Sequence, residues 1–262
     1  MKYDMKRSVL ILLVMLPGIF ASGQVKIIAH RGASYIAPEN TVAASKLAWE
    51  LGADAVECDI YLTGDNKIIV CHDGTTKRTT GEDYRISETD SKTLRKLDAG
   101  SFRDEKYRGE RLPFLKELIR TVPAGKELVV EIKCKSEILP FLKKEIDRYR
   151  KDRNFSFICS DFQTLCDTKK IFPGDPCYWL CSNASLLEAT LEKVPPAGLE
   201  GISLAYAIIN ESVIKKAGDL NLEVYSWTVD DPAEAKRLTG LGVKGLTTNR
   251  PGWLNEQIKL NP

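Results

Sequence analysis

The chain has 262 residues, of which 43% are hydrophobic and 28% are charged, and its formal net charge at pH 7 is +2. These values are typical of a globular protein with one large domain or two small ones, and no basic stripe indicates a nucleic-acid partner. Any anionic ligand must therefore be recognised by a local group of residues rather than by the net charge of the protein.

The N-terminal segment has the order of a secretory signal peptide, in which basic residues precede an apolar stretch and small residues follow it. These parts are Lys2, Lys6 and Arg7, then residues 9–20, then residues 21–23. An uncleaved membrane anchor is the alternative, but 12 apolar residues interrupted by a proline are short for crossing a bilayer. We therefore predict a signal peptide over residues 1–23, export to the periplasm or the extracellular space, and no stable membrane insertion of the mature chain.

After this segment, short apolar runs alternate with helical segments, which is typical of a (β/α)8 TIM barrel. The runs with strand-like composition are residues 26–30, 55–62, 128–133, 156–160, 177–181, 201–205, 223–228 and 243–248. The main alternative is an open doubly wound sheet, but no glycine-rich phosphate loop follows the first run. We predict a barrel that forms a single domain over residues 24–262.

Helices are expected between the strands. The first has apolar residues at helical spacing from Ala44 to Leu51 and ends at Gly52. Another begins at Asp231, which supplies an N-cap and is followed by a first-turn proline and a capping-box glutamate. The other expected helices are residues 113–122, 136–150, 163–170, 184–193 and 211–217.

Two stretches interrupt the alternation after the second strand. A polar turn over residues 63–66, followed by an apolar run over residues 68–71, predicts a β-hairpin. A mainly polar insertion then extends from about residue 74 to residue 111. In a barrel, this insertion would lie at the C-terminal ends of the strands, where loops shape substrate pockets.

The seven cysteines lack the dense spacing of a disulfide-stabilised small domain. Cys58, Cys71 and Cys134 each follow a polar residue or precede one in a strand-like run, so we expect their thiols to face away from any site. Cys177 and Cys181 could pair, and their spacing alone leaves this open. The odd number leaves at least one free thiol unless chains cross-link.

Spaced carboxylates occur on two of the predicted strands. Glu57 and Asp59 share one face of the second strand, and Glu131 and Lys133 share one face of the third. Because apolar residues occupy the opposite faces, we expect these four side chains to point into the barrel near its C-terminal rim. A hard divalent cation, Mg²⁺ or Ca²⁺, would relieve the repulsion among three carboxylates. The alternative is that the acids only form ion pairs with Lys133 and nearby arginines.

Both histidines of the chain lie at the ends of strand-like runs, His30 after the first strand and His72 after the hairpin. Histidine titrates near neutral pH, so two imidazoles on either side of a scissile bond can act as general base and general acid. Arg31 and Lys133 are donors suited to an anionic group such as phosphate. Together these residues predict metal-assisted phosphoryl chemistry.

A series of motifs follows this pattern along the chain: HRGASYIAPENT, ECDIYLT, CHD, EIK, YSWTV and TTNRP. In order and spacing they resemble the signature of the glycerophosphodiester phosphodiesterase family, and the resemblance covers nearly the whole mature chain. It implies a TIM barrel that hydrolyses glycerophosphodiesters, the deacylated phospholipids, to glycerol 3-phosphate and an alcohol. It also implies one divalent cation, Ca²⁺ or Mg²⁺, as cofactor.

The resemblance further implies roles for individual residues. The acid–base pair would be His30 and His72, and the phosphate contacts would be Arg31 and Lys133. The metal ligands would be Glu57, Asp59 and Glu131. Glu39 corresponds to a glutamate close to the metal, and Trp227 to the aromatic residue that lines the glycerol pocket, with core packing as the alternative for Trp227. Many relatives have Asp where this chain has Asn249.

Two other functions remain open. A phosphodiesterase of the same fold could act on another lipid-derived or inositol phosphodiester, although the mainly polar insertion favours a small soluble substrate. A barrel that binds a phosphate ligand without catalysis is the second. The headgroup, the oligomeric state and the attacking group, either water or the glycerol hydroxyl of the substrate, are not determined by the sequence.

Overall fold

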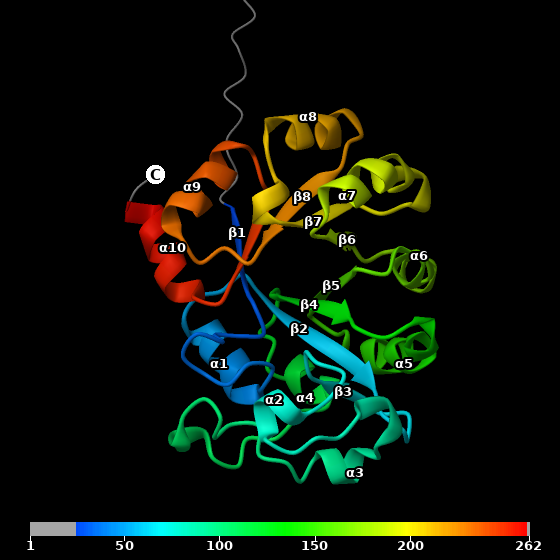
Figure 1. Ribbon diagram of the computed structural model, residues 1–262, viewed down its shortest axis with the longest axis vertical. Coiled ribbons are helices and arrows are strands. Elements are labelled where there is room, and N and C mark those ends of the chain that lie inside the picture. The colour runs from blue at the N-terminus through cyan, green and yellow to red at the C-terminus, as the bar shows by residue number, and fades with distance from the viewer. Residues whose placement is uncertain (1–24, 261–262) are drawn as a thin grey trace, which may run out of the picture.

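The computed structural model describes residues 25–260, and its strands form one closed barrel (Figure 1). The predicted signal peptide over residues 1–23 lies outside the described residues. The strands are β1 (Lys26–Ala29), β2 (Ala55–Leu62), β3 (Ile68–Val70), β4 (Glu127–Ile132), β5 (Asn154–Cys159), β6 (Cys177–Cys181), β7 (Gly201–Ala205), β8 (Glu223–Trp227) and β9 (Gly245–Thr248).

Helices lie on the outside of this barrel, so that strands and helices alternate along most of the chain (Figure 1). Within the described residues the α-helices are α1 (Val42–Glu50), α2 (Lys77–Thr80), α3 (Ser91–Leu94), α4 (Leu115–Ile119), α5 (Leu139–Tyr149), α6 (Phe162–Ile171), α7 (Ala184–Thr190), α8 (Glu211–Asp219), α9 (Pro232–Gly240) and α10 (Pro251–Leu260). None of these helices is long and apolar enough to cross a membrane.

The barrel closes through β1, which pairs in parallel with β2 on one side and with β9 on the other. The sheet has nine strands, and β3 is the one that pairs antiparallel, with β2 as its neighbour. The other strands form a parallel eight-stranded ring, so the predicted TIM barrel is confirmed and the open sheet is excluded. The hairpin strand β3 lies outside the ring, at the C-terminal end of β2.

The side-chain alternation along β2 brings polar groups into the barrel. Val56, Cys58 and Ile60 pack in the main apolar core between strands and helices, whereas Glu57 and Asp59 point to the opposite face. Apolar and aromatic side chains of β2 and other strands also fill the interior, namely Ile28, Ala55, Val129, Ile158, Tyr178 and Tyr225. The buried carboxylates therefore lie in the same interior as this apolar cluster.

The insertion after the hairpin builds a small core of its own. This insertion cluster consists of Ile69, Cys71, Ile86, Leu94, Leu97, Ala99 and Leu112. It is separate from the main core between the barrel and its helices. The insertion also contains α2, α3 and two short 3₁₀ helices, Ile86–Glu88 and Glu105–Tyr107. Although its composition is mainly polar, the insertion is thus a folded unit packed on β3.

Some expected elements differ in the structure. The helix expected over residues 113–122 is shorter, because Phe114 caps it in an extended conformation and its backbone N–H donates to Glu117 Oε2 at 2.8 Å. The terminal helix α10 was not expected; it begins at Pro251, whose fixed φ suits a first helical turn.

All seven cysteines lie in the described residues as free thiols. Cys177 and Cys181 occupy the two ends of β6, and four residues of strand span about 13 Å, which is too far for a disulfide. The pairing left open for them is therefore excluded. Cys58 packs in the main core and Cys71 in the insertion cluster, both facing away from the carboxylates.

Candidate active site

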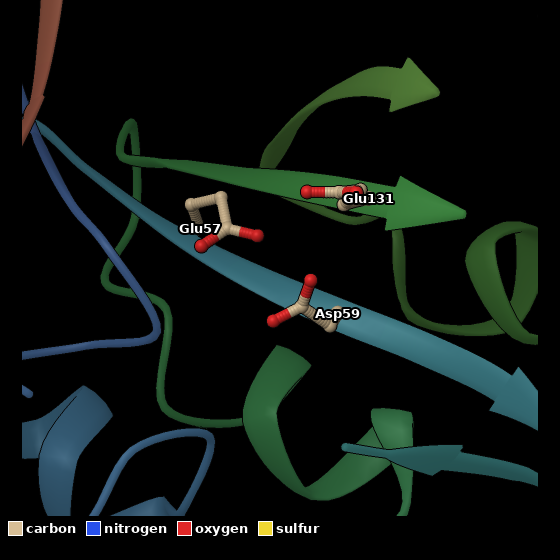
Figure 2. Close-up of side chains that lie close together, drawn as sticks. All are labelled: Glu57, Asp59 and Glu131. Carbon is tan, nitrogen blue, oxygen red and sulfur yellow. The ribbon is translucent and has the colours of Figure 1, made fainter. Parts of the chain in front are cut away.

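Three carboxylates converge inside the barrel, Glu57 and Asp59 from β2 and Glu131 from β4. The two strands are parallel neighbours, and Asp59 pairs in register with Glu131. One oxygen atom from each of the three side chains lies within 4.8 Å of the others, and Figure 2 shows the three side chains turned toward a common point. All three residues are buried, with exposed fractions of 2%, 1% and 9% in chain order.

This convergence is electrostatically unfavourable for bare carboxylates. Burial raises the pKa of Glu57 well above its ordinary value, and the charges of Asp59 and Glu131 add to the effect. Burial and the charge of Asp59 also raise the pKa of Glu131. Glu57 Oε1 and Asp59 Oδ1 are buried and accept no hydrogen bond. A buried oxygen without a partner is costly, so this group of acids fits a hard divalent cation.

Lys133 and Arg31 supply positive charge beside the acids. Lys133 Nζ donates to Glu131 Oε1 at 2.7 Å and lies 3.6 Å from Asp59 Oδ1. Arg31 Nε lies 3.3 Å from Asp59 Oδ2. Burial alone would lower the pKa of Lys133, but Glu131 and Asp59 outweigh it and raise that pKa. Ion pairing is therefore present, yet neither Glu57 Oε1 nor Asp59 Oδ1 accepts a hydrogen bond.

The loop after β1 aims backbone and side-chain donors at these acids. Arg31 has a φ of 54°, and its backbone N–H donates to Glu57 Oε2 at 2.9 Å. Gly32 follows with a φ of 80°, and a Cβ there would lie 2.6 Å from the carbonyl carbon of Ala44. Only glycine fits this close approach to α1 without a shift. The conformation of the loop thus depends on the Arg-Gly pair of the motif.

Asn40 holds Asp59 from the same loop. Its Nδ2 donates to Asp59 Oδ2 at 2.8 Å, and its Oδ1 accepts from the Asp59 backbone N–H at 3.2 Å. The side chain is 4% exposed, and the residue has a φ of 59°, which asparagine tolerates better than most residues. The sequence reasoning missed this role, although Asn40 stands inside the Pro-Glu-Asn-Thr motif.

His30 lies at the C-terminal end of β1, where its Nδ1 is 2.7 Å from Asn249 Oδ1. Asn249 Nδ2 in turn donates to Asp230 Oδ2 at 2.6 Å, which turns the amide oxygen toward the imidazole. Nδ1 therefore carries the proton, and Nε2 is left as a proton acceptor. Burial, followed by the charge of Arg31, lowers the pKa of His30 to about 4.

His72 follows β3, and its Nδ1 lies 2.7 Å from Asp73 Oδ1. The two imidazoles thus use the same atom for a supporting hydrogen bond and keep Nε2 free. Their supports differ in charge, because Asp73 is a carboxylate and the group beside His30 is the neutral amide of Asn249.

A cavity of about 150 Å³ brings most of the predicted site residues together. Its polar wall is formed by His30, Arg31, Glu57, His72, Glu131 and Lys133. The other lining residues are Ile158, Leu180, Ser203, Trp227, Thr228 and Thr247. Trp227 is partly buried, and its Nε1 donates to the carbonyl oxygen of Ser203 at 3.1 Å.

The remaining predicted residues, Asp59 and Glu39, do not line the cavity. Asp59 is fully buried and held by Asn40. Glu39 Oε1 accepts from Arg31 Nη1 at 3.0 Å, and the same carboxylate binds Arg78. The sequence reasoning did not identify Arg78, because no motif marked it within the insertion.

Comparisons with known proteins point to one family. Residues 30–253 match the sequence model of the glycerophosphoryl diester phosphodiesterase family. The chain is 35% identical over 241 residues to the glycerophosphodiester phosphodiesterase of Caldanaerobacter subterraneus subsp. tengcongensis, covering 89% of this chain and 97% of that protein.

Solved structures agree with the sequence comparisons. One is a phosphodiesterase from Oleispira antarctica in complex with the product sn-glycerol-3-phosphate, with a TM-score of 0.85, 27% identity, and coverage of 89% of this chain and 96% of that chain. Another is a glycerophosphodiester phosphodiesterase from Thermotoga maritima, with a TM-score of 0.74, 26% identity, and coverage of 91% and 99%.

Proposed function

The chain belongs to the glycerophosphoryl diester phosphodiesterase family and is an enzyme of that activity, and we propose that it works with one divalent cation and two histidines. The substrate would be a glycerophosphodiester, and the products would be glycerol 3-phosphate and an alcohol. The observation that carries the proposal is that His30 and His72, each with a supported Nδ1, line one cavity with two cationic side chains and two of the buried acids, Glu57 and Glu131.

Glu57, Asp59 and Glu131 would hold the cation, Ca²⁺ or Mg²⁺. Their two buried oxygen atoms without a hydrogen-bond partner support this assignment. Oxygen-only ligation favours these hard ions over zinc. When bound, a divalent cation supplies charge that polarises a phosphoryl oxygen.

Arg31 and Lys133 would bind the phosphate. Their positive charges offset the negative charge of the diester and of the phosphoryl group during transfer. Both side chains reach the cavity and are partly buried, so water screens them less than it screens surface residues. Trp227 would contact the glycerol part of the substrate with the apolar face of its ring, because its indole N–H already has a partner.

The two histidines would divide the proton transfers. His30 is neutral at pH 7, since its pKa is about 4, and its free Nε2 can accept the proton of the attacking hydroxyl. That hydroxyl belongs to water or to the glycerol of the substrate. As the phosphorus–oxygen bond to the alcohol breaks, His72 would give a proton to the departing oxygen, and Asp73 would stabilise the charged imidazole.

The test is hydrolysis of a small panel by the chelated enzyme, with Ca²⁺ or Mg²⁺ added back. The panel contains glycerophosphocholine, glycerophosphoethanolamine, glycerophosphoinositol and an intact phospholipid. The measured product is glycerol 3-phosphate for the three glycerophosphodiesters, and the released headgroup, free or phosphorylated, for the intact phospholipid. We expect hydrolysis of one or more of the three glycerophosphodiesters. His30→Gln and His72→Gln should lose turnover without loss of fold. Activity on the intact phospholipid alone would favour another lipid phosphodiesterase, and binding without hydrolysis would favour a non-catalytic barrel.

We also propose that the protein is exported. The basic, apolar and small residues of its N-terminal segment support this proposal. The test is the N-terminal sequence of the protein recovered from outside the cytoplasm, which should begin close to residue 24. Recovery of the uncleaved chain from the membrane would instead favour an anchor.

A further inference from the structure

Arg78 of α2 joins two loops of the site through all three nitrogen atoms of its guanidinium group. Its Nε donates to Asp73 Oδ2 at 2.6 Å. Its Nη1 and Nη2 donate to Glu39 Oε2 at 2.7 Å and to Glu39 Oε1 at 2.8 Å. The contact with Glu39 is therefore bidentate, a geometry that fixes direction as well as distance.

Each partner of Arg78 is also bonded to a residue that lines the cavity. Asp73 uses its other oxygen, Oδ1, for His72 at 2.7 Å. Glu39 accepts from Arg31 Nη1 at 3.0 Å. A continuous path of hydrogen bonds thus connects the histidine of the hairpin with the arginine of the loop after β1.

The segment that carries Arg78 is itself well held. The side chain of Thr76, just before α2, is fully buried and donates to the carbonyl oxygen of Glu82 at 2.6 Å. It also accepts from the backbone N–H of Tyr84 at 3.2 Å, while the Thr76 backbone N–H donates to the Tyr84 carbonyl at 3.1 Å. These bonds close the loop around α2, so Arg78 is presented from a fixed backbone.

The two carboxylates of this path, Glu39 and Asp73, stay ionised at neutral pH. Burial alone would raise the pKa of Glu39, but the hydrogen bonds and charges of Arg78 and Arg31 outweigh it and hold that pKa below its ordinary value. Burial also opposes ionisation of Asp73, whose pKa is nevertheless lowered, chiefly by its hydrogen bonds with Arg78 and His72. Both carboxylates are therefore anions at neutral pH and need a cation between them.

We propose that Arg78 is a positioning residue for the hydrolysis reaction. It holds His72 through Asp73 and Arg31 through Glu39, and so fixes the position of His72 relative to Arg31. The inference rests on the proposed function, because it assigns Arg78 a part in aligning the proton donor with the phosphate. The insertion thus contributes to catalysis by alignment, without touching the substrate. A lysine could replace the charge but not the three directed donors.

The competing interpretation is an ordinary ion pair that only stabilises the insertion, since Arg78 is 46% exposed. Arg85 provides the matched control. It lies in the same insertion and pairs with Glu88 at 3.1 Å, with both side chains more than half exposed. Neither Arg85 nor Glu88 contacts the side chains that line the cavity. A general loss of ion pairing in the insertion should therefore affect Arg78 and Arg85 variants alike.

The first experiment measures kcat and KM for a glycerophosphodiester. We expect Arg78→Met to lower kcat about 10- to 100-fold with KM changed less than about threefold, because alignment is lost rather than binding. Arg78→Lys should be intermediate, and Arg85→Met should match the wild type. Asp73→Asn and the double variant Arg78→Met/Asp73→Asn should be about equally impaired, since both act on His72. Equal kcat in Arg78→Met and Arg85→Met, or fully additive effects, would overturn the proposal.

The second experiment needs no turnover and no metal. The chain has two histidines, so long-range ¹H–¹⁵N spectra of the chelated protein at about pH 9 contain the signals of two imidazoles. His30→Gln assigns the signals. We expect His72 to show one tautomer with the proton on Nδ1 in the wild type and in Arg85→Met, and a mixture of tautomers in Arg78→Met.

The two experiments separate the two proposals. An inactive wild type with the expected spectra would reject the proposed function and leave the structural role of Arg78 in place. An active wild type whose His72 spectrum is unchanged by Arg78→Met would reject the positioning role. If Arg78→Met does not fold, Arg78→Lys supports the same comparison, because it keeps the charge and loses only the directed donors.

Discussion

His30 is held by Asn249 through a single hydrogen bond of 2.7 Å between Nδ1 and the amide oxygen. The support is neutral, whereas the corresponding support of His72 is the carboxylate of Asp73. A neutral acceptor orients an imidazole but does not stabilise its positive charge as a carboxylate does. The two supports therefore differ in charge, which agrees with the base and acid roles proposed for His30 and His72.

Asn249→Ala should lower kcat about 10- to 100-fold, because Nδ1 of His30 would lose its acceptor and the ring would lose its fixed tautomer. Ser34→Ala is the control, since Ser34 Oγ donates to the same amide oxygen at 2.9 Å but does not reach the imidazole. We expect Ser34→Ala to change kcat less than about threefold. Steady-state kinetics of both variants check this, and a similar loss in both would contradict it.

The pKa of His30 predicts a pH dependence of stability. The unfolded chain takes up a proton near pH 6.5, whereas the folded imidazole does so only near pH 4. Protons therefore favour the unfolded state in this window, and the contribution present above pH 6.5 is lost as the pH falls toward 4. It is on the order of 3 kcal/mol.

Urea unfolding of the chelated protein between pH 7 and pH 4 measures this effect. Acidic residues contribute equally to the wild type and to His30→Gln, so the difference between their free energies of unfolding isolates His30. We expect the wild type to lose more stability than His30→Gln on acidification. Parallel pH profiles would show that the folded imidazole has an ordinary pKa.

Metal binding should raise the melting temperature of the wild type. A ligand that binds only the folded state stabilises it, by about 2.7 kcal/mol at a hundredfold excess over Kd. Asp59→Asn should abolish most of this shift, because it removes one of the three converging carboxylates. Thermal unfolding with chelator, Ca²⁺ or Mg²⁺ is the measurement. The prediction fails if Asp59→Asn responds to the ions as the wild type does.

Two glycines with a φ of 80° make a matched pair. At Gly52 a Cβ would meet nothing within 4 Å, so Gly52→Ala should cost only the backbone strain of about 1 kcal/mol. At Gly32 a Cβ would meet Ala44 at 2.6 Å, so Gly32→Ala should cost more, about 3 kcal/mol, and should also reduce activity. Unfolding and kinetics together test this, and equal costs would contradict the assigned contact.

The alternation of acidic and apolar residues in β2 and β4 was sufficient to predict which side chains enter the barrel. A strand has a period of two, so Glu57, Asp59 and Glu131 could be placed on one face without knowing the register. Their convergence then required only that the two strands be neighbours, which their order in a barrel provides. The hairpin was predictable because its turn residues are local signals.

Arg78 and Asn40 could not be placed in the same way. The position of Arg78 depends on the path of an insertion whose small core is formed by scattered apolar residues without a clear period. Asn40 lies in a loop whose shape follows from a contact between Gly32 and α1, distant from any repeating pattern. Side-chain contacts across loops depend on tertiary structure, and local sequence carries little information about them.

His30 and His72 line one cavity but are carried by different parts of the fold. His30 follows a strand of the barrel, whereas His72 and Asp73 follow β3, whose Ile69 packs in the insertion cluster while Ile68 and Val70 pack in the main core. A unit with fewer buried apolar contacts opens at a lower free-energy cost than the barrel around it. We therefore expect heating to inactivate the enzyme before the barrel melts, through a local opening of the insertion that separates His72 from His30 and closes again on cooling.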